Sequence, residues 1–248
     1  MIFSYCIIFV AFVLNQYSEG FEFVNKSPFQ NLMKREFKLF TDWLVCEERG
    51  AALFYYKTVP DTGNLPRLGS FRYDPEFPRE CQQKSTTAYG SIYDRGHLVP
   101  ANHLDHDSVA IAESNYMTNI LPQYAQLNRG AWLVSEEITE CYRDLYDLEV
   151  IGGIVMGDDA ENDIFLQSHG VRTPDWFWKI IRNLENGEII AWIMPNDATA
   201  VRSSVDKYLV SVAEIEEKSG FFFPEITDEQ RARVEPVSWP KPVGCDLS

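Results

Sequence analysis

Three motifs lie close together between Tyr93 and Glu137. They read YDRGHLVPANH from residue 93, SNYMTNILPQ from residue 114 and LNRGAWLVSEE from residue 127. In the first motif, Arg95 and His97 stand on either side of Gly96, which allows a backbone turn that a side chain would hinder. Such a turn can present a guanidinium and an imidazole to the same phosphate.

The residue types in these motifs suit the hydrolysis of a phosphodiester. That reaction needs a base to deprotonate water, positive charge beside the phosphorane and a group that stabilises the leaving oxygen. A histidine, an arginine and a hydrated metal ion meet these needs. The DRGH tetrapeptide alone is not decisive, because four fixed residues occur by chance about once in several hundred chains of this length. The two motifs that follow it make the signal specific.

Together the motifs resemble the DNA/RNA non-specific endonucleases of the ββα-metal (His-Me finger) superfamily. The DRGH, SNY..NI.PQ and LN.GAW segments stand in the same order and at matching spacing, and the likeness extends more loosely to Thr173–Lys179 and Met194–Asn196. The resemblance implies an α+β fold with a central, mainly antiparallel sheet flanked by helices. It also implies metal-dependent cleavage of DNA and RNA, so nucleic acids are the expected partners.

The resemblance assigns roles to individual residues. His97 would be the general base that activates water, and Arg95 would contact the scissile phosphate. Asn128 would be the one protein ligand of a Mg²⁺ ion, with Mn²⁺ as the alternative; hard cations of this kind keep much of their hydration and need few protein oxygens. Asn119 would lie near the site, and Glu136 would order metal-bound water.

Helix geometry favours Glu136 over Glu137 for that role. If Asn128 opens a helix, eight residues at about 100° each bring Glu136 within about 80° of it, whereas Glu137 falls opposite. The rise along the helix separates the two Cα atoms by about 12 Å, so water must mediate. Asparagine also favours helix N-caps, and capping without metal binding is the alternative for Asn128. Either Arg67 or Arg72 would fill the place of an upstream family arginine.

The N-terminus predicts a secreted protein. Residues 2–14 form an almost unbroken apolar run, followed by the small residues Ser18 and Gly20. This pattern is typical of a signal peptide, here residues 1–20, with one nuclease domain over residues 21–248. The run is shorter than the roughly 20 residues that span a bilayer, so a membrane anchor is the weaker interpretation and no stable membrane association is expected.

Cysteine usage agrees with an oxidising compartment. Cys6 falls in the predicted signal peptide, and four cysteines remain, which suits two disulfides. Three pairings are open, and sequence proximity favours Cys46 with Cys81 and Cys141 with Cys245. No CxxC pair suggests zinc.

The net charge of −15 excludes a protein that holds nucleic acid through a wide basic surface. A nucleic-acid substrate must instead meet a local arginine patch and a metal ion. Turnover is therefore expected rather than tight binding.

Hydrophobic patterns predict interspersed strands and helices, and hence an α+β class. Residues 148–156 form a buried-strand pattern, and residues 177–184 and 188–194 form a hairpin around Asn186-Gly187. Residues 132–145 and 205–215 show helical spacing, the second ending at Gly220. Residues 60–89 are expected to form loops.

Two alternatives remain open on the sequence alone. Residues 102–107 contain two histidines and two carboxylates and resemble a metal cluster, although a solvated loop is the simpler interpretation.

Lys179 is expected at the surface. The same fold can also serve a catalytically inactive secreted binding protein or a phosphodiesterase with another substrate.

Overall fold

The computed structural model describes residues 21–247. The predicted signal peptide lies outside the described residues. A six-stranded sheet forms the centre, and every pairing in it is antiparallel. Its order is β2-β3-β4-β7-β8-β9, with bounds β2 Met33–Glu36, β3 Thr41–Val45, β4 Gly50–Lys57, β7 Leu148–Val155, β8 Trp176–Asn183 and β9 Ile189–Pro195. The expected α+β architecture with a mainly antiparallel sheet is confirmed.

The strands follow the sequence pattern closely. The buried run at 148–156 forms β7, and the two apolar runs around Asn186-Gly187 form the β8–β9 hairpin. Gly187 has a φ of +76°, which a residue with a side chain rarely adopts, so the Asn-Gly pair turns the chain as predicted.

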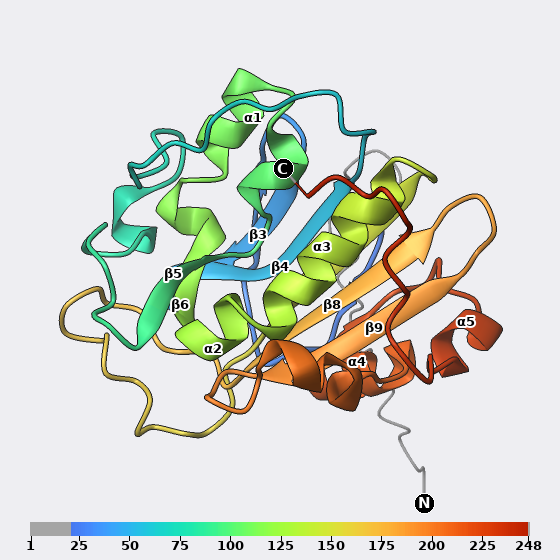
Figure 1. Cartoon of the computed structure of the whole chain (residues 1–248). Helices are drawn as coiled ribbons and strands as arrows, with labels where there is room; N and C mark the ends of the chain where they lie inside the picture. Colours follow the sequence, from blue (N-terminus) through green and yellow to red (C-terminus); the bar gives the residue numbers. More distant parts are fainter. Residues whose placement is uncertain (1–20, 248) are drawn as a thin grey trace, which may run out of the picture.

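Both faces of the sheet are covered, as Figure 1 shows. Alternate residues of a strand point to opposite faces. On β8, Lys179 contacts Trp132 of helix α3 (Ala131–Arg143), whereas Trp178 contacts Phe221 and Phe223 on the other side. The prediction of a surface lysine is therefore wrong, because a strand between two neighbours and under a helix has no solvent-facing side; Lys179 is 0% exposed.

A second, two-stranded sheet carries the first motif. Strand β5 (Tyr93–His97) pairs antiparallel with β6 (Ile120–Tyr124), and His97 lies opposite Ile120. The short helix α2 (Ala125–Asn128) and then α3 follow β6 directly. This strand, strand and helix unit brings residues from all three motifs to one side of the main sheet.

The predicted helix over residues 205–215 is interrupted. A 3-10 helix spans Arg202–Tyr208 and α4 spans Val212–Ser219. Between them Leu209 bridges to Trp192, so the chain extends along the edge strand β9. Ser211 then starts α4 with a capping box, and α4 ends at Gly220 as expected.

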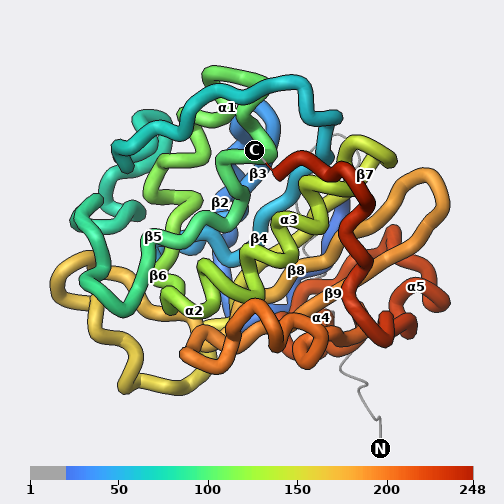
Figure 2. Tube along the Cα trace, viewed as in Figure 1, coloured from blue at the N-terminus to red at the C-terminus, as the bar shows by residue number. Residues whose placement is uncertain are grey.

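The remaining elements are short. They are β1 (Val24–Asn25), which pairs with β10 (Phe221–Phe222), α1 (Ser108–Glu113), α5 (Asp228–Ala232) and three further 3-10 turns, Arg79–Cys81, Ala101–Leu104 and Met117–Asn119. Residues 60–89 are mostly irregular, as predicted, and in Figure 2 the chain from 58 to 92, cyan to teal, runs along the outside of the molecule. No helix within residues 21–247 combines the length and apolar character needed to cross a membrane.

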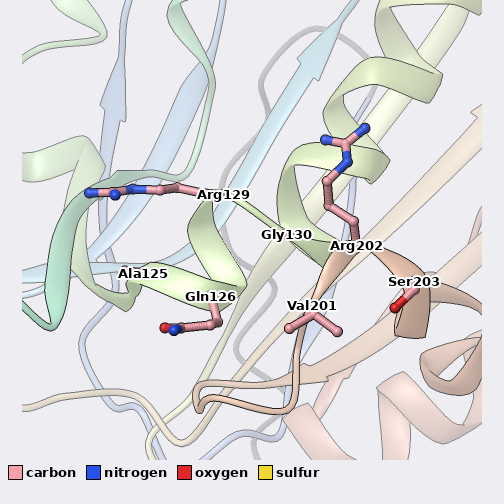
Figure 3. A pocket seen from close by; sticks show the side chains of 7 residues that line it. All are labelled: Ala125, Gln126, Arg129, Gly130, Val201, Arg202 and Ser203. Atoms are coloured by element: carbon pink, nitrogen blue, oxygen red, sulfur yellow. The ribbon is translucent and has the colours of Figure 1, made fainter.

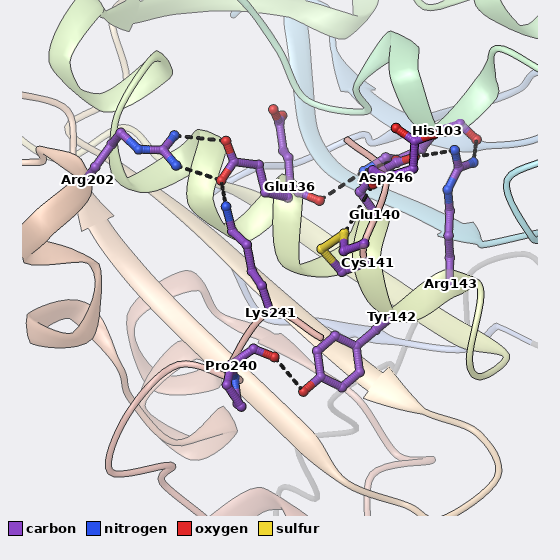
Figure 4. Close-up of a disulfide and its surroundings, with 12 residues drawn as sticks. His103, Glu136, Glu140, Cys141, Tyr142, Arg143, Arg202, Pro240, Lys241 and Asp246 are labelled. Carbon is purple, nitrogen blue, oxygen red and sulfur yellow. Dashed lines mark hydrogen bonds and ion pairs between the residues drawn. A yellow bond between two sulfur atoms is a disulfide. The ribbon is translucent and has the colours of Figure 1, made fainter. Parts of the chain in front are cut away.

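Both disulfides favoured by sequence proximity are formed. Cys46 pairs with Cys81, and Cys141 pairs with Cys245. The second bond ties the C-terminal segment to α3, and the hydroxyl of Tyr142 donates to the carbonyl of Pro240 beside it (Figure 4). The segment therefore lies along α3 at a fixed position.

Candidate active site

A pocket of about 200 Å³ lies where β5, α2 and α3 meet. It brings together residues that are up to 69 positions apart in the sequence, and its lining consists of Arg67, His97, Pro100, Ala101, Asn128, Arg129, Leu133 and Glu136. Three of the five predicted site residues, His97, Asn128 and Glu136, therefore share one cavity.

His97 is the last residue of β5, and its two ring nitrogens have different surroundings. Nε2 lies 2.8 Å from Oδ1 of Asn115. The amide nitrogen of Asn115 donates to the carbonyl of Leu68 at 2.7 Å, so its oxygen must face the imidazole as an acceptor. Nε2 therefore carries the proton. Nδ1 keeps its lone pair and has no hydrogen-bond partner among residues 21–247, so it is the nitrogen that can accept a proton.

The surroundings of His97 keep the ring neutral. Burial lowers the pKa of His97 to about 4, the Asn115 hydrogen bond acts against this, and the positive charges of Arg67 and Arg95 lower it further. At neutral pH the imidazole is thus available as a base. Phe71 packs against the ring, with centroids 5.5 Å apart.

Asn128 is oriented by Asp94 of the same DRGH motif as His97. Its amide nitrogen donates to Oδ2 of Asp94 at 2.9 Å, and Asp94 also forms a bidentate pair with Arg129. The amide oxygen of Asn128 then has no protein partner in the described part of the chain. Asp94 thus fixes the orientation of the Asn128 amide and leaves its oxygen free at the pocket.

Asn128 does not open a helix, contrary to expectation. It is the last residue of α2, and α3 begins three residues later at Ala131. Gly130 has a non-helical backbone and separates the two helices, and a Cβ there would meet the carbonyl oxygens of Gln126 and Ala200. The N-cap alternative for Asn128 is therefore wrong, and the helical angle between Asn128 and Glu136 has no basis.

Glu136 nevertheless proves to be the pocket carboxylate. Glu137 instead forms ion pairs with Arg202 and Lys241 (Figure 4), and it does not line this pocket. Burial raises the pKa of Glu136, and the charges of Lys179 and Arg67 act against that shift.

Of the two candidate upstream arginines, Arg67 lies at the pocket. Its Nε donates to Oδ1 of Asn102 at 2.6 Å. Arg72 is turned elsewhere, since it donates to the carbonyl of Ala112 and packs over the ring of Tyr116.

Arg95 lies beside the pocket without lining it. It shares a face of β5 with His97, stacks 4.0 Å from the ring centroid of Phe71 and donates to the carbonyl of Thr86 at 2.9 Å. Phe71 therefore contacts both the guanidinium and the imidazole. Both groups remain on the same side of the small sheet.

Asn119 is not in the pocket. It is 0% exposed, and its amide group bonds only to backbone: its oxygen accepts from Val99 N, and its nitrogen donates to the carbonyls of Val99 and Ser114, each at 2.9 Å. Asn119 fixes the chain directly after His97 and has no free group for substrate.

Comparison with known proteins agrees with this geometry. The sequence profile of the DNA/RNA non-specific endonucleases matches residues 23–230, which is most of the chain. The chain belongs to the DNA/RNA non-specific endonuclease family. All three motifs and every pocket residue fall inside the matched range.

Individual members of this endonuclease family are similar over about two thirds of the chain. The mitochondrial nuclease EXOG of Mus musculus is 30% identical over 174 residues, 63% of this chain and 46% of that protein. A nuclease of Nostoc sp. is 30% identical over 65% of this chain and 61% of its own length. Human mitochondrial endonuclease G is 28% identical over 62% and 55%. The chain spans about half the length of the curated relatives it matches.

A solved structure shows the shared fold. The EndoG chain in the crystal structure of the EndoG/EndoGI complex superimposes with a TM-score of 0.70 at 18% sequence identity, over 82% of this chain and 90% of that chain. At this identity the likeness establishes the fold.

The family's divalent cation fits the donor groups at the pocket. The free amide oxygen of Asn128 is a hard ligand of the type that Mg²⁺ prefers. Within residues 21–247 no group of three or more His, Cys, Asp or Glu side chains is arranged to hold a metal ion. A cation at Asn128 would thus keep most of its water, as the resemblance implied.

The rival cluster at residues 102–107 does not form a metal site. His103 is buried, with Nδ1 bound to the hydroxyl of Tyr56 and Nε2 beside Glu140 and the carbonyl of Glu136. Asp107 caps α1 and pairs with Lys38. These side chains are already engaged with the protein, and they are not a solvated loop.

A larger hollow of about 480 Å³ lies next to the endonuclease pocket and shares only Arg129 with it. Arg129 and Arg202 point away from each other there, as Figure 3 shows. Gly130 and Val201 also line the hollow, and none of the predicted site residues does.

Two site residues of this family member were not predicted from the sequence. Asn115, which orients His97, stands four positions before Asn119 in the SNYMTN motif, so its presence in a motif was the available signal. Asp94, which orients Asn128, is part of DRGH. Neither role can be deduced from spacing, because each depends on contacts between separate elements.

Proposed function

We propose that this chain is a secreted, metal-dependent endonuclease that hydrolyses phosphodiester bonds of DNA and RNA. The observation that carries the proposal is the pocket in which the free Nδ1 of His97 and the free amide oxygen of Asn128 occur together. Family membership supports the same activity.

Each pocket residue has a chemical task in this proposal. His97 takes a proton from water at Nδ1, while Asn115 holds the proton on Nε2. Arg67 and Arg95 supply positive charge to the phosphate as negative charge develops on it. A divalent cation held by Asn128 would supply Lewis-acid stabilisation of the phosphate oxygens. Since these contacts address the backbone, cleavage with little sequence preference follows.

The deciding experiment is a nuclease assay on residues 21–248 with circular plasmid DNA and with RNA, with and without EDTA. Internal cutting that EDTA abolishes is the expected result. His97→Ala should lower kcat by at least 10²-fold, because a general base typically contributes about 10² to 10⁴. A folded His97→Ala variant with full activity would contradict the mechanism, and an inactive wild type would favour a binding protein on this fold.

Secretion is supported by the two disulfides, since such bonds persist in oxidising compartments. We expect the mature protein to begin near Phe21 and to contain no free thiol. Mass spectrometry after expression in a secreting host checks both points. An intact Met1 terminus, or four cysteines that alkylate without reduction, would exclude this part of the proposal.

A further inference from the structure

Lys179 is a buried ammonium in the middle of the main sheet. It lies on β8 between Gly152 of β7 and Trp192 of β9, and it is 0% exposed. Its side chain extends toward α3, the helix that carries Glu136. None of the steps proposed above uses this charge.

The contacts of Lys179 are with the part of α3 that borders the pocket. Nζ donates to Oγ of Ser135 at 2.9 Å and lies 3.8 Å from the ring centroid of Trp132. Ser135 directly precedes Glu136, and Trp132 lies one turn before it. The indole nitrogen of Trp132 in turn donates to the carbonyl of His97 at 3.2 Å. The ammonium therefore lies beneath the junction between the helix and the end of β5.

Stability alone does not account for a charge at this position. Removing an ammonium from water costs several kcal/mol, and partners must offset that cost. Among residues 21–247, Nζ has one oxygen partner for its three N–H groups, together with one aromatic ring. A methionine of similar length would fill the same space without the desolvation cost.

Glu136 is the nearest candidate for the missing compensation, because it stands one residue after Ser135 and one turn after Trp132, the two residues of α3 that Lys179 contacts. Burial lowers the pKa of Lys179 to about 8, and Glu136 acts against this. The groups that act on Glu136 are Lys179 below, Arg67 at the pocket, the indole of Trp132 and Glu137 along the helix, and the buried hydroxyl of Tyr56 also faces it. Of these, Lys179 opposes the raised pKa of Glu136 most. His103 supplies no positive charge, because burial lowers its pKa well below the usual value.

We propose that Lys179 is a positioning residue for phosphodiester cleavage, whose buried ammonium holds Glu136 in place as a carboxylate beside His97. It acts through α3 and does not touch the substrate. The inference rests on the proposed nuclease function for its kinetic consequences, but the pairing of Lys179 with Glu136 can be measured without activity.

Lys179→Met tests the role directly. We expect kcat to fall about 10- to 100-fold, the range typical of groups that orient a catalytic site, with KM changed by less than about twofold. The melting temperature should stay the same or rise, because a desolvated charge is removed. A purely structural lysine predicts the opposite: a lower melting temperature with an unchanged kcat.

Lys218→Met is the matched control. Lys218 also lies over a tryptophan, 3.6 Å from the ring centroid of Trp176, but it is exposed and does not line the pocket. The same substitution there should leave kcat unchanged. Equal losses in both variants would overturn the assignment to Lys179.

A double-variant cycle shows whether Lys179 acts through Glu136. In a Glu136→Gln background, Lys179→Met should lower kcat less than threefold further, since the group that it positions is already absent. If the double variant instead loses kcat by the product of the two single-variant factors, Lys179 acts independently of Glu136, and the proposal is overturned.

Two NMR measurements judge the pairing independently of nuclease activity. In Lys179→Met the side-chain carboxyl ¹³C resonance of Glu136 should titrate at higher pH than in the wild type. In Glu136→Gln the ¹³Cε resonance of Lys179 should titrate at lower pH, and this second test needs no substitution at Lys179. Unchanged titrations would refute the pairing even in an active enzyme. The expected shifts in a protein that cuts no nucleic acid would instead leave the pairing standing and refute the proposed function.

Discussion

At the scale of single residues, the proposed chemistry depends on which nitrogen of His97 is free. Asn115 accepts a hydrogen bond from Nε2 and is itself held by the carbonyl of Leu68. The tautomer of His97, the proposed base, is thus set by a neighbour 18 residues further along the chain. Substitution at Asn115 should therefore change catalysis without removing any group that touches the substrate.

Asn115→Asp should move the acid limb of the pH–rate profile upward. A carboxylate beside Nε2 favours the charged imidazolium, so the pKa of His97 rises from about 4 toward its ordinary value. Because only neutral His97 accepts a proton, activity should then be lost at a higher pH than in the wild type. Measurement of kcat/KM between pH 4 and 9 checks this. Asn119→Asp is not a suitable control, because the Asn119 amide holds the backbone in place. An acid limb that does not move would contradict the assigned contact.

Asn128→Ala and Asn128→Asp form a second pair of residue-scale tests. The alanine variant should fold normally but lose nearly all Mg²⁺-dependent cleavage, because no other protein ligand replaces the amide oxygen. The aspartate variant can still bind a hard cation and should recover part of the activity, with a changed preference between Mg²⁺ and Mn²⁺. Activity titrated against each metal gives the result, and wild-type activity in the alanine variant at every metal concentration would contradict the role of Asn128.

At the scale of elements, β3 contains a buried carboxyl with no partner. Asp42 is 0% exposed, and neither of its oxygens has a hydrogen-bond partner in the described structure. Burial raises its pKa well above the usual value, and Asp74 adds to this while Arg35 acts against it. Since the folded protein prefers the protonated form, the stability associated with Asp42 is greatest below pH 3.8 and declines as the pH rises toward the folded-state pKa.

Asp42→Asn should therefore stabilise the fold at pH 8, because the amide cannot ionise in the unfolded chain, and the gain should be about 1.4 kcal/mol for each unit by which folding raises the pKa of Asp42. The gain should shrink as the pH falls toward 4, where the wild-type carboxyl is protonated. Denaturant unfolding at several pH values measures both effects. If Asp42→Asn raises the free energy of unfolding as much at pH 4 as at pH 8, the pKa of Asp42 is not raised by folding.

The local secondary structure also determines the different contacts of Asn115 and Asn119. Asn115 and Asn119 stand in one motif, but the 3-10 turn Met117–Asn119 directs Asn115 to the imidazole and Asn119 to the backbone of Val99. The motif indicated that asparagines matter here. Their roles followed only from the pairing of β5 with β6.

At the scale of the whole molecule, the net charge of −15 limits how the protein meets a polyanion. The cations near the pocket are few: Arg67 and Arg129 line it, and Arg95 lies beside it. Each neutralised phosphate contributes a slope of roughly −0.9 to the dependence of log K on log salt concentration. Three contacts predict a slope of about −3.

Fluorescence anisotropy of duplex DNA binding in EDTA measures that slope, and Arg67→Gln should reduce its magnitude by about one unit. Lys218→Met, which lies away from the pocket, serves as the control and should leave the slope unchanged. A slope steeper than about −6 would reveal a wide basic surface that the described residues do not suggest. Added cation should restore turnover much more than affinity.

The sequence by itself predicted the α+β class and the β8–β9 hairpin, favoured the observed disulfide pairs among three possible pairings, and pointed through the family motifs to His97, Asn128 and Glu136. These features depend on local pattern, on the order of the cysteines along the chain or on motifs whose residue types suit one chemistry. The tertiary structure alone decided that α3 begins after Asn128, that Arg67 rather than Arg72 reaches the pocket, that Asn119 binds backbone and that Lys179 is buried. The physical reason is the same in each case: a side chain's surroundings depend on which distant elements pack against it, and the spacing of residues along the chain does not record that packing.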